Sequence, residues 1–471
     1  MRVRNKKIKG SYKRTSSSAI STSILALSIS GCGNSDQPIL IDGGGTEGNL
    51  ISGAGTLRGT NNHDIIQGSN TSDRFFGFSG NDIIFTGGGE DTVYGGLGDD
   101  EIELVDKDEL IDGGLGDDTI SIAGPLANYE LFIDLDEGII RMSNEIEQLI
   151  STLVSIENIV STSSRDTQVN GSPTSNSIST GSGDDLIYSG DGNNFINTGA
   201  GDDQVTLNAG IHNIDLGSGD DIVNNVGFRS TILGNTGFDE LHFNASDAIA
   251  NLKVNLSTNT ISDNQGNVTN LSNFEKIIVT GPNSVQFTGT SSNDFFVGDR
   301  GNDNFNGGGG SDQFFGGAGR DTFSITQNGT ITIKDFETGD QGDTISYDDN
   351  KDPSPLATQL KFIDIKSGPQ SRLTDSSDIL IITSETGFES DTLLLLALNG
   401  LSGVTAHTQS ALIDADMLSV WFNNNSNMCE VSIVSDTNRD NVLDTITSVA
   451  YLEDISVNDL ASLSIENFQI I

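Results

Sequence analysis

The segment Gly95-Gly96-Leu97-Gly98-Asp99-Asp100-Glu101-Ile102 contains the pattern that decides the fold. Glycines stand five, four and two residues before the second aspartate, and an apolar residue stands two residues after it. Steps of nine from Asp64 reach an acid each time, and each acid is followed two residues later by Ile, Val or Phe. These acids are Asp64, Asp73, Asp82, Asp91, Asp100, Glu109 and Asp118. A nine-residue repeat therefore covers residues 59–121.

Two further arrays keep the same spacing. The array over 171–242 places polar residues at the acid position and Ile, Val or Leu two residues later. Its acid positions read Asn176, Asp185, Asn194, Asp203, His212, Asp221, Ser230 and Asp239. The array over 289–324 has Asp294, Asp303, Asp312 and Asp321, followed by Phe296, Phe305, Phe314 and Phe323. The apolar position never fails, which predicts a repeated strand with one inward side chain.

The residue types in the repeat indicate an all-oxygen cation site. Glycine permits turns with positive φ and lets backbone carbonyls approach a ligand. A recurrent carboxylate beside such carbonyls suits Ca²⁺, which takes 6–8 oxygen ligands; Mg²⁺ demands tighter octahedral geometry and fits less well. Zinc is disfavoured because the sequence has no Cys/His cluster.

The spacing predicts a flattened parallel roll in which two nonapeptides make one coil. Stacked coils would place like carboxylates roughly 4.8 Å apart. At an effective dielectric of about 20, each such pair repels by about 3 kcal/mol. One buried aliphatic side chain per nonapeptide contributes only about 1.5–3 kcal/mol. We therefore expect folding and calcium binding to be a single equilibrium.

These arrays resemble the RTX (haemolysin-type) calcium-binding repeat, GGxGxDxUx. The resemblance implies an all-β parallel β-roll with Ca²⁺ held between turns by glycine carbonyls and aspartate side chains. The positions that match this motif are Asp82, Asp91, Gly95, Gly96, Gly98, Asp100, Gly113, Gly114, Gly116, Asp118, Gly181, Gly183, Asp185, Gly199, Gly201, Asp203, Gly217, Gly219, Asp221, Gly298, Gly301, Asp303, Gly307, Gly308, Gly310, Asp312, Gly316, Gly317, Gly319 and Asp321. The motif is weakened where Asn176, Asn194, His212 and Ser230 replace the acid, and where Leu207 and Leu216 replace the first glycine. A metal-free, apolar-stacked turn is the alternative there.

The charge balance excludes several classes of partner. The chain of 471 residues has 23 Lys and Arg against 67 Asp and Glu, a formal net charge of −44. Seven of the basic residues lie in the first fourteen positions. So acidic a chain argues against nucleic acid and anionic membranes as partners and favours cations. With only Cys32 and Cys429, no disulfide framework is expected.

The N-terminal residues 1–32 read as a secretory signal segment. A basic stretch precedes a moderately apolar run that is too short to span a bilayer comfortably. The run ends in Ile29-Ser30-Gly31-Cys32, which resembles a bacterial lipobox and implies a lipid anchor at Cys32. An ordinary signal with a chance cysteine is the alternative. Residues 33–58 are rich in Gly, Ser and Asn and are predicted to be a linker.

The remaining chain divides into repeat blocks and other segments. Blocks are predicted at 59–123, 171–243 and 289–350, the last with a capping strand near Ile331–Phe336. The segments 124–170 and 244–288 resemble each other and are predicted to be β-rich inserts. Apolar runs in 351–471, such as Ile379–Ile382 and Val431–Val434, predict an ordinary β-domain.

The C-terminal region contains one further candidate metal site. Asp436, Asn438, Asp440 and Asp444 resemble the start of an EF-hand-type loop, but Gly at the sixth position and Glu at the twelfth are missing. An Asx-rich hairpin turn is the alternative. Cys429 is expected to be a buried small hydrophobe. The acidic chain end with apolar tips is similar to the C-terminus of type I secretion substrates.

No catalytic motif is apparent in the sequence. It contains no HExxH, no G-x-S-x-G and no P-loop. The leading hypothesis is a non-catalytic calcium-binding protein with a structural or adhesive role, either extracellular or on the outer cell surface of a bacterium, that folds on Ca²⁺ after export. One alternative is a secreted enzyme with a site in 351–471; another is an adhesin with a glycan- or ice-binding surface. The surface partner is not predicted.

Overall fold

The computed structural model describes most of the repeat region and parts of the C-terminal region. The described residues are 39–41, 49–105, 109–123, 126, 129–143, 148–245, 252–325, 329–338, 342–347, 360–364, 379–383, 417–423, 425–435, 445–456, 459–463 and 467–470. All of them belong to one compact unit, Pro38–Ile471. Within these ranges the chain is all-β, with no α-helix and one short 3₁₀-helix, η3 (Asp459–Ser462). The predicted fold class is confirmed.

Strands alternate along the chain between two sheets, which we call A and B. Sheet A contains β1 (Ile39–Ile41), β2 (Leu50–Ser52), β4 (Ile65–Gln67), β6 (Ile83–Phe85), β8 (Glu101–Leu104), β10 (Thr119–Ile122), β14 (Asn158–Ser161), β16 (Ser177–Ser179), β18 (Phe195–Asn197), β20 (Asn213–Asp215), β22 (Thr231–Leu233), β24 (Leu252–Asn255), β25 (Thr260–Ser262), β26 (Val268–Ser272), β28 (Val285–Thr288), β30 (Asn304–Asn306), β32 (Thr322–Ile325), β34 (Thr344–Tyr347) and β40 (Phe468–Ile470).

Sheet B contains β3 (Thr56–Arg58), β5 (Arg74–Ser79), β7 (Thr92–Leu97), β9 (Leu110–Leu115), β11 (Glu130–Asp134), β12 (Ile139–Ser143), β13 (Gln148–Val154), β15 (Thr167–Asn170), β17 (Leu186–Tyr188), β19 (Gln204–Thr206), β21 (Ile222–Val226), β23 (Glu240–Asn244), β27 (Lys276–Thr280), β29 (Phe295–Val297), β31 (Gly310–Phe315), β33 (Gly329–Ile333), β35 (Leu360–Asp364), β36 (Ile379–Thr383), β37 (Met417–Asn423), β38 (Met428–Ser435) and β39 (Thr445–Leu452).

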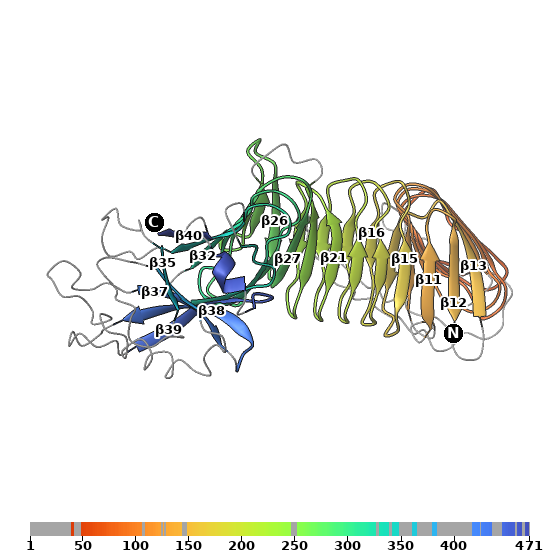
Figure 1. Cartoon of the computed structure of the whole chain (residues 1–471). Helices are drawn as coiled ribbons and strands as arrows, with labels where there is room; N and C mark the ends of the chain where they lie inside the picture. The colour runs from red at the N-terminus through yellow and green to blue at the C-terminus, as the bar shows by residue number, and fades with distance from the viewer. Residues whose placement is uncertain are drawn as a thin grey trace, which may run out of the picture. The chain divides into compact units, whose positions relative to one another are not determined.

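Each coil of the solenoid consists of two nonapeptides. Within the repeat blocks, neighbouring strands of one sheet are parallel, and paired residues stand 18 positions apart, as in Ile65↔Ile83 and Ile83↔Glu101. About 15 coils extend over residues 50–346. Figure 1 shows the strands of the repeat blocks lying side by side along the solenoid. The predicted pairing of two nonapeptides per coil is correct.

The core consists of the apolar residue two positions after each acid. Ile66, Ile84 and Ile102 in sheet A are fully buried, as are Phe75 and Val93 in sheet B. Short strands such as β4 and β6 bury only their middle residue. In the third block this position is Phe, and the rings stack: the centroids of Phe287 and Phe305 lie 4.7 Å apart, and those of Phe305 and Phe323 lie 5.0 Å apart.

The two inserts have the same strand order on opposite sheets. In the first insert, β11–β12–β13 form an antiparallel set between β15 and β9 of sheet B. In the second, β24–β25–β26 do the same between β28 and β22 of sheet A. The sheets differ because successive nonapeptides alternate between them. Each insert therefore adds strands to one sheet while coils continue on both sides of it.

The solenoid begins inside the segment predicted to be a linker. Strands β2 and β3 pair in parallel with β4 and β5, so residues 50–58 of the predicted linker 33–58 belong to the first coil. Gly55 stands where later repeats have the acid, which is why the acid pattern fails there. Leu57 keeps the apolar position and is fully buried.

The predicted capping strand does not end its sheet. On the side opposite β31, strand β33 pairs in parallel with β39, and Lys334 Nζ contacts Glu453 Oε1 at 2.6 Å. Strand β40 likewise pairs with β34 in sheet A. Strands of the C-terminal region therefore continue both sheets. Cys429 is buried, as predicted, and so is Trp421.

We find no helix in the described ranges that is long and apolar enough to cross a membrane.

Candidate metal centre

The acids of the repeat form buried columns along the two edges of the solenoid. Each acid precedes a strand, and its side chain contacts the coil before it. Asp64 N–H donates to Asp82 Oδ1 (2.7 Å), Asp82 N–H to Asp100 Oδ1 (2.8 Å) and Asp100 N–H to Asp118 Oδ1 (2.8 Å). The same 18-residue contact is made by Asp91, Asp185, Asp203, Asp221, Asp239, Asp303, Asp312 and Asp321. One carboxylate oxygen therefore links successive coils.

The second carboxylate oxygen is buried without a hydrogen-bond partner in many of these turns. This holds for Oδ2 of Asp82, Asp100, Asp118, Asp185, Asp203, Asp221, Asp239, Asp303 and Asp321. A buried polar atom without a partner costs about 1–3 kcal/mol, and more when the group is charged. Repeating this at coil after coil is unfavourable for a protein that folds alone. A cation beside each oxygen removes the penalty.

Backbone carbonyls converge on the same places. A Cβ added to Gly95 would lie within 3.0 Å of both Asp100 Oδ2 and the carbonyl oxygen of Gly113 in the next coil. Only glycine leaves this space open. The same crowding of a carboxylate oxygen at the first glycine is found at Gly77, Gly234, Gly289, Gly298, Gly307 and Gly316. The second glycine serves the turn itself: Gly96 has φ of 122°.

Burial raises the pKa of these carboxylates although backbone hydrogen bonds lower it, as do the nearby Thr180 hydroxyl at Asp185 and Thr198 hydroxyl at Asp203, each of which donates its proton to a backbone carbonyl. The pKa rises to about 7 for Asp82, Asp118, Asp185, Asp221, Asp303, Asp312 and Asp321, and to about 6 for Asp100, Asp203 and Asp239. Coulombic repulsion from other acids adds to the rise at Asp82 and Asp221. The charged form therefore needs a compensating cation.

The ligand set fits calcium. At Gly77, Gly95 and Gly298 one carboxylate oxygen and one carbonyl oxygen of the next coil lie together, and no group of three or more His, Cys, Asp or Glu side chains in the described ranges could hold a metal ion. A site of this composition offers oxygen ligands. Ca²⁺ accepts such ligands in flexible number, whereas zinc requires N and S ligands.

In three acids the second carboxylate oxygen accepts hydrogen bonds from a residue of its own turn instead. Asp64 Oδ2 accepts hydrogen bonds from the N–H and the hydroxyl of Thr60, at 2.6 and 2.9 Å. Ser69 closes Asp73 and Thr290 closes Asp294 in the same way. In each case a hydroxyl residue stands four positions before the acid, where the motif has its second glycine. These three acids were not among the predicted ligands.

In each insert a glutamate takes the place of the next aspartate in one acid column. Asp118 N–H donates to Glu157 Oε2 and Asp239 N–H to Glu275 Oε2, both at 2.9 Å. The longer side chain replaces the next aspartate at the point where an insert interrupts the repeat. Glu157 and Glu275 occupy equivalent places in the two inserts, in agreement with the similarity of their sequences.

Some features of the site were missed in the sequence. Asp239 has the same buried Oδ2 as the predicted ligands, and the glycines Gly234 and Gly237 stand at the motif positions before it. The link from Oδ1 to the preceding coil has no sequence signature at all. The predicted C-terminal metal loop (Asp436, Asn438, Asp440 and Asp444) and Cys32 lie outside the described residues.

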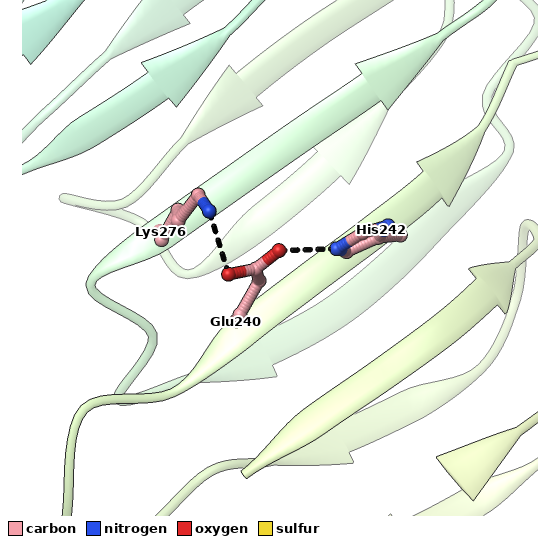
Figure 2. Close-up of polar contacts among 3 residues, drawn as sticks. All are labelled: Glu240, His242 and Lys276. Carbon is pink, nitrogen blue, oxygen red and sulfur yellow. Dashed lines mark hydrogen bonds and ion pairs between the residues drawn. The ribbon is translucent and has the colours of Figure 1, made fainter. Parts of the chain in front are cut away.

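A cluster of polar side chains on sheet B begins directly after Asp239 and Glu275 of the acid column (Figure 2). Glu240 on β23 contacts His242 Nε2 through Oε1 and Lys276 Nζ through Oε2, the latter at 2.7 Å. Burial acts to raise the pKa of Glu240, but the hydrogen bonds and charges of Lys276 and His242 outweigh it and lower the pKa. Both oxygens of Glu240 are occupied, which marks a cross-strand ion pair.

Comparison with known proteins agrees with this geometry. The family described as "RTX calcium-binding nonapeptide repeat (4 copies)" matches residues 51–77, 67–102, 170–205 and 288–323. This chain carries RTX calcium-binding repeats. The RTX matches fall in the solenoid, and the first begins at Ile51, inside the first coil. No curated protein matches the chain significantly.

Proposed function

We propose that this chain is an extracellular or surface-exposed calcium-binding structural protein whose RTX solenoid folds when Ca²⁺ enters its buried turns. The observation that carries the proposal is the row of buried Oδ2 atoms without partners. The family match supports calcium as the ion.

The proposed ligands are the aspartates of the acid columns with the glycine carbonyls facing them. They comprise the predicted set from Asp82 to Asp321, and we add Asp239. Bound calcium would supply positive charge between coils, neutralise the carboxylates and join successive turns. Because the unfolded chain has no preformed site, the binding free energy becomes folding free energy.

The N-terminal sequence supports an extracellular location. Residues 1–32 have the composition of a signal segment, and Cys32 would allow a lipid anchor. Calcium is scarce in the cytosol and abundant outside the cell, so the acidic chain would stay unfolded until it leaves the cell. A structural or adhesive role at the bacterial surface follows from a long calcium-stiffened solenoid.

Circular dichroism of the full chain tests the proposal. We expect the β-sheet signal to appear as Ca²⁺ is added to metal-free protein, to disappear with EGTA and to return with excess Ca²⁺. Mg²⁺ at the same concentration should not replace it. An unchanged β-sheet signal after complete chelation would contradict calcium-coupled folding.

A further inference from the structure

The two edges of the middle repeat block carry different residues at the acid position. Before the strands of sheet B stand the acids Asp185, Asp203, Asp221 and Asp239, which we call the acid edge. Before the strands of sheet A stand Asn176, Asn194, His212 and Ser230, which we call the amide edge. All eight side chains are buried. Every substitution of the acid in this block therefore falls on one edge.

Asn194 shows how a turn of the amide edge is closed. Its Oδ1 accepts the N–H of Asn176 at 2.7 Å, the same 18-residue contact that the aspartates make. Its Nδ2 faces the carbonyl oxygens of Ser189, Gly190 and Asp191, at 2.9, 3.3 and 3.2 Å. Three carbonyl oxygens thus converge on one N–H donor. In an aspartate turn the atom at this position is Oδ2, which in its ionised form can only accept.

The orientation of the Asn194 amide follows from its surroundings. Turning it over would place Oδ1 against three carbonyl oxygens and Nδ2 against the N–H of Asn176, so every contact would become repulsive. An asparagine oxygen is an ordinary calcium ligand. Here that oxygen is already engaged by Asn176 N–H, and the donor side of the amide occupies the space among the carbonyls.

The neighbours of Asn194 are also closed by contacts within the protein. Asn176 Nδ2 donates to the Glu157 carbonyl at 2.7 Å, while its Oδ1 accepts the N–H of Ser172 in its own turn at 2.8 Å. His212 Nδ1 accepts Asn194 N–H at 3.4 Å, while Nε2 lies 3.2 Å from the Asn208 carbonyl. Burial lowers the pKa of His212, although the contact with Asn208 raises it. A neutral ring with its proton on Nε2 satisfies both contacts. Ser230 Oγ accepts His212 N–H at 3.1 Å.

We propose that the amide edge is a metal-free column in which side-chain N–H groups take the place of calcium, so that calcium in the middle block is bound along the acid edge alone. Asn194 is the residue that decides this for its own turn. The inference rests on the proposed function, because it specifies which turns of the same solenoid hold the ion.

Calcium bound per chain tests the inference, measured by equilibrium dialysis and atomic emission on full-length protein. The variants are Asn194→Ala on the amide edge and Asp203→Ala, nine residues later, on the acid edge. We expect Asn194→Ala to bind as much calcium as the original protein, with a lower melting temperature. Asp203→Ala should bind less. A loss of calcium in Asn194→Ala would make Asn194 a ligand and overturn the inference.

A second variant keeps the test decisive if Asn194→Ala does not fold. Asn194→Asp replaces the amide donor by a carboxylate that faces the same three carbonyl oxygens. We expect this variant, once circular dichroism shows it folded in Ca²⁺, to bind more calcium than the original protein. An unchanged amount would overturn the assignment of Asn194 as the determinant of its turn. If the original protein binds no calcium, it is the proposed function that fails.

Discussion

The two edges of the middle block share one core and differ at the corner of each turn. The inward residues behind the amide edge (Ile178, Ile196, Ile214 and Ile232) and behind the acid edge (Ile187, Val205, Val223 and Leu241) are all fully buried. Strands on both edges pair in parallel with an 18-residue register, although β21 and β23 are longer and their register shifts after Val223. We infer that apolar stacking specifies the coil, whereas the corner residue decides whether the turn requires a cation.

Converting the acid edge into an amide edge is the strongest test of this comparison. Asp203→Asn with Asp221→Asn should remove two buried oxygens that lack partners and supply two donors. We expect less bound calcium and a metal-free form stabilised by about 1–3 kcal/mol per site. The β-sheet circular dichroism that remains in EGTA measures how far the metal-free form is stabilised. A variant that loses this signal as fully as the original protein would show that the two edges do not differ in this way.

Filling a glycine cradle should weaken the acid-lined turns. Gly95→Ala would place its Cβ against Asp100 Oδ2 and the Gly113 carbonyl. In the presence of calcium we expect the free energy of unfolding to fall by about 1–3 kcal/mol. The midpoint of calcium-induced folding should move to a higher calcium concentration. Thermal unfolding and a calcium titration measure the two effects.

Gly227→Ala is the matched control for this substitution. A Cβ on Gly227 meets no atom within 4 Å. It should leave the calcium midpoint unchanged. Equal effects of the two alanines would mean that the space beside Asp100 is not where the ion binds.

The acid edge should also respond to pH when metal is absent. The folded-state pKa of Asp221 is raised to about 7, above its ordinary value near 3.8. The folded form therefore holds this proton more strongly than the unfolded form does. Its stabilising effect is complete below pH 4 and is lost as the pH rises through 7. Metal-depleted protein should therefore recover part of its β-sheet circular dichroism at pH 5 and lose it at pH 8.

Calcium should reverse that order. The ion needs the ionised carboxylate, so the calcium affinity should fall as the pH drops below 7. The β-sheet circular dichroism recorded at both pH values, with and without Ca²⁺, separates the two effects. A metal-free protein with more β-sheet signal at pH 8 than at pH 5 would contradict the burial of charged, unpartnered acids.

The turns closed by a hydroxyl should show the smallest effect. Thr60→Val removes the hydroxyl bond to Asp64 Oδ2 and keeps the N–H bond of residue 60. We expect the free energy of unfolding to fall by about 1 kcal/mol with no change in bound calcium. A drop in bound calcium, measured by dialysis, would place Asp64 among the ligands.

The fold could be predicted from the sequence because an acid and an apolar residue recur at a spacing of nine. The spacing of nine and the invariant apolar position predicted the two-sheet parallel coil, and all those apolar residues are buried. The start of the solenoid could not be predicted, since Gly55 lacks the acid on which the pattern depends. The continuation of the sheets by β39 and β40 depends on contacts between residues more than 100 positions apart, such as Ile331 with Ala450.

The candidate site was predicted in its residues but not in its geometry. Aspartate and glycine positions indicated an oxygen site, yet the division of labour between Oδ1 and Oδ2 needs the three-dimensional contact between coils. The same holds for Asn194: in the sequence it is a weakened acid position, whereas in the structure its amide donates to three carbonyl oxygens. Asparagine at the acid position therefore replaces the carboxylate by a side chain that satisfies the turn with its own hydrogen bonds.

Anomalous diffraction from crystals grown in saturating calcium tests directly whether calcium binds at the aspartate corners. We expect density about 2.3–2.6 Å from the buried Oδ2 atoms of Asp82, Asp100, Asp118 and the acid edge. We expect none among the carbonyls beside Asn194. Tightly stacked coils with no density at the aspartate corners would contradict it.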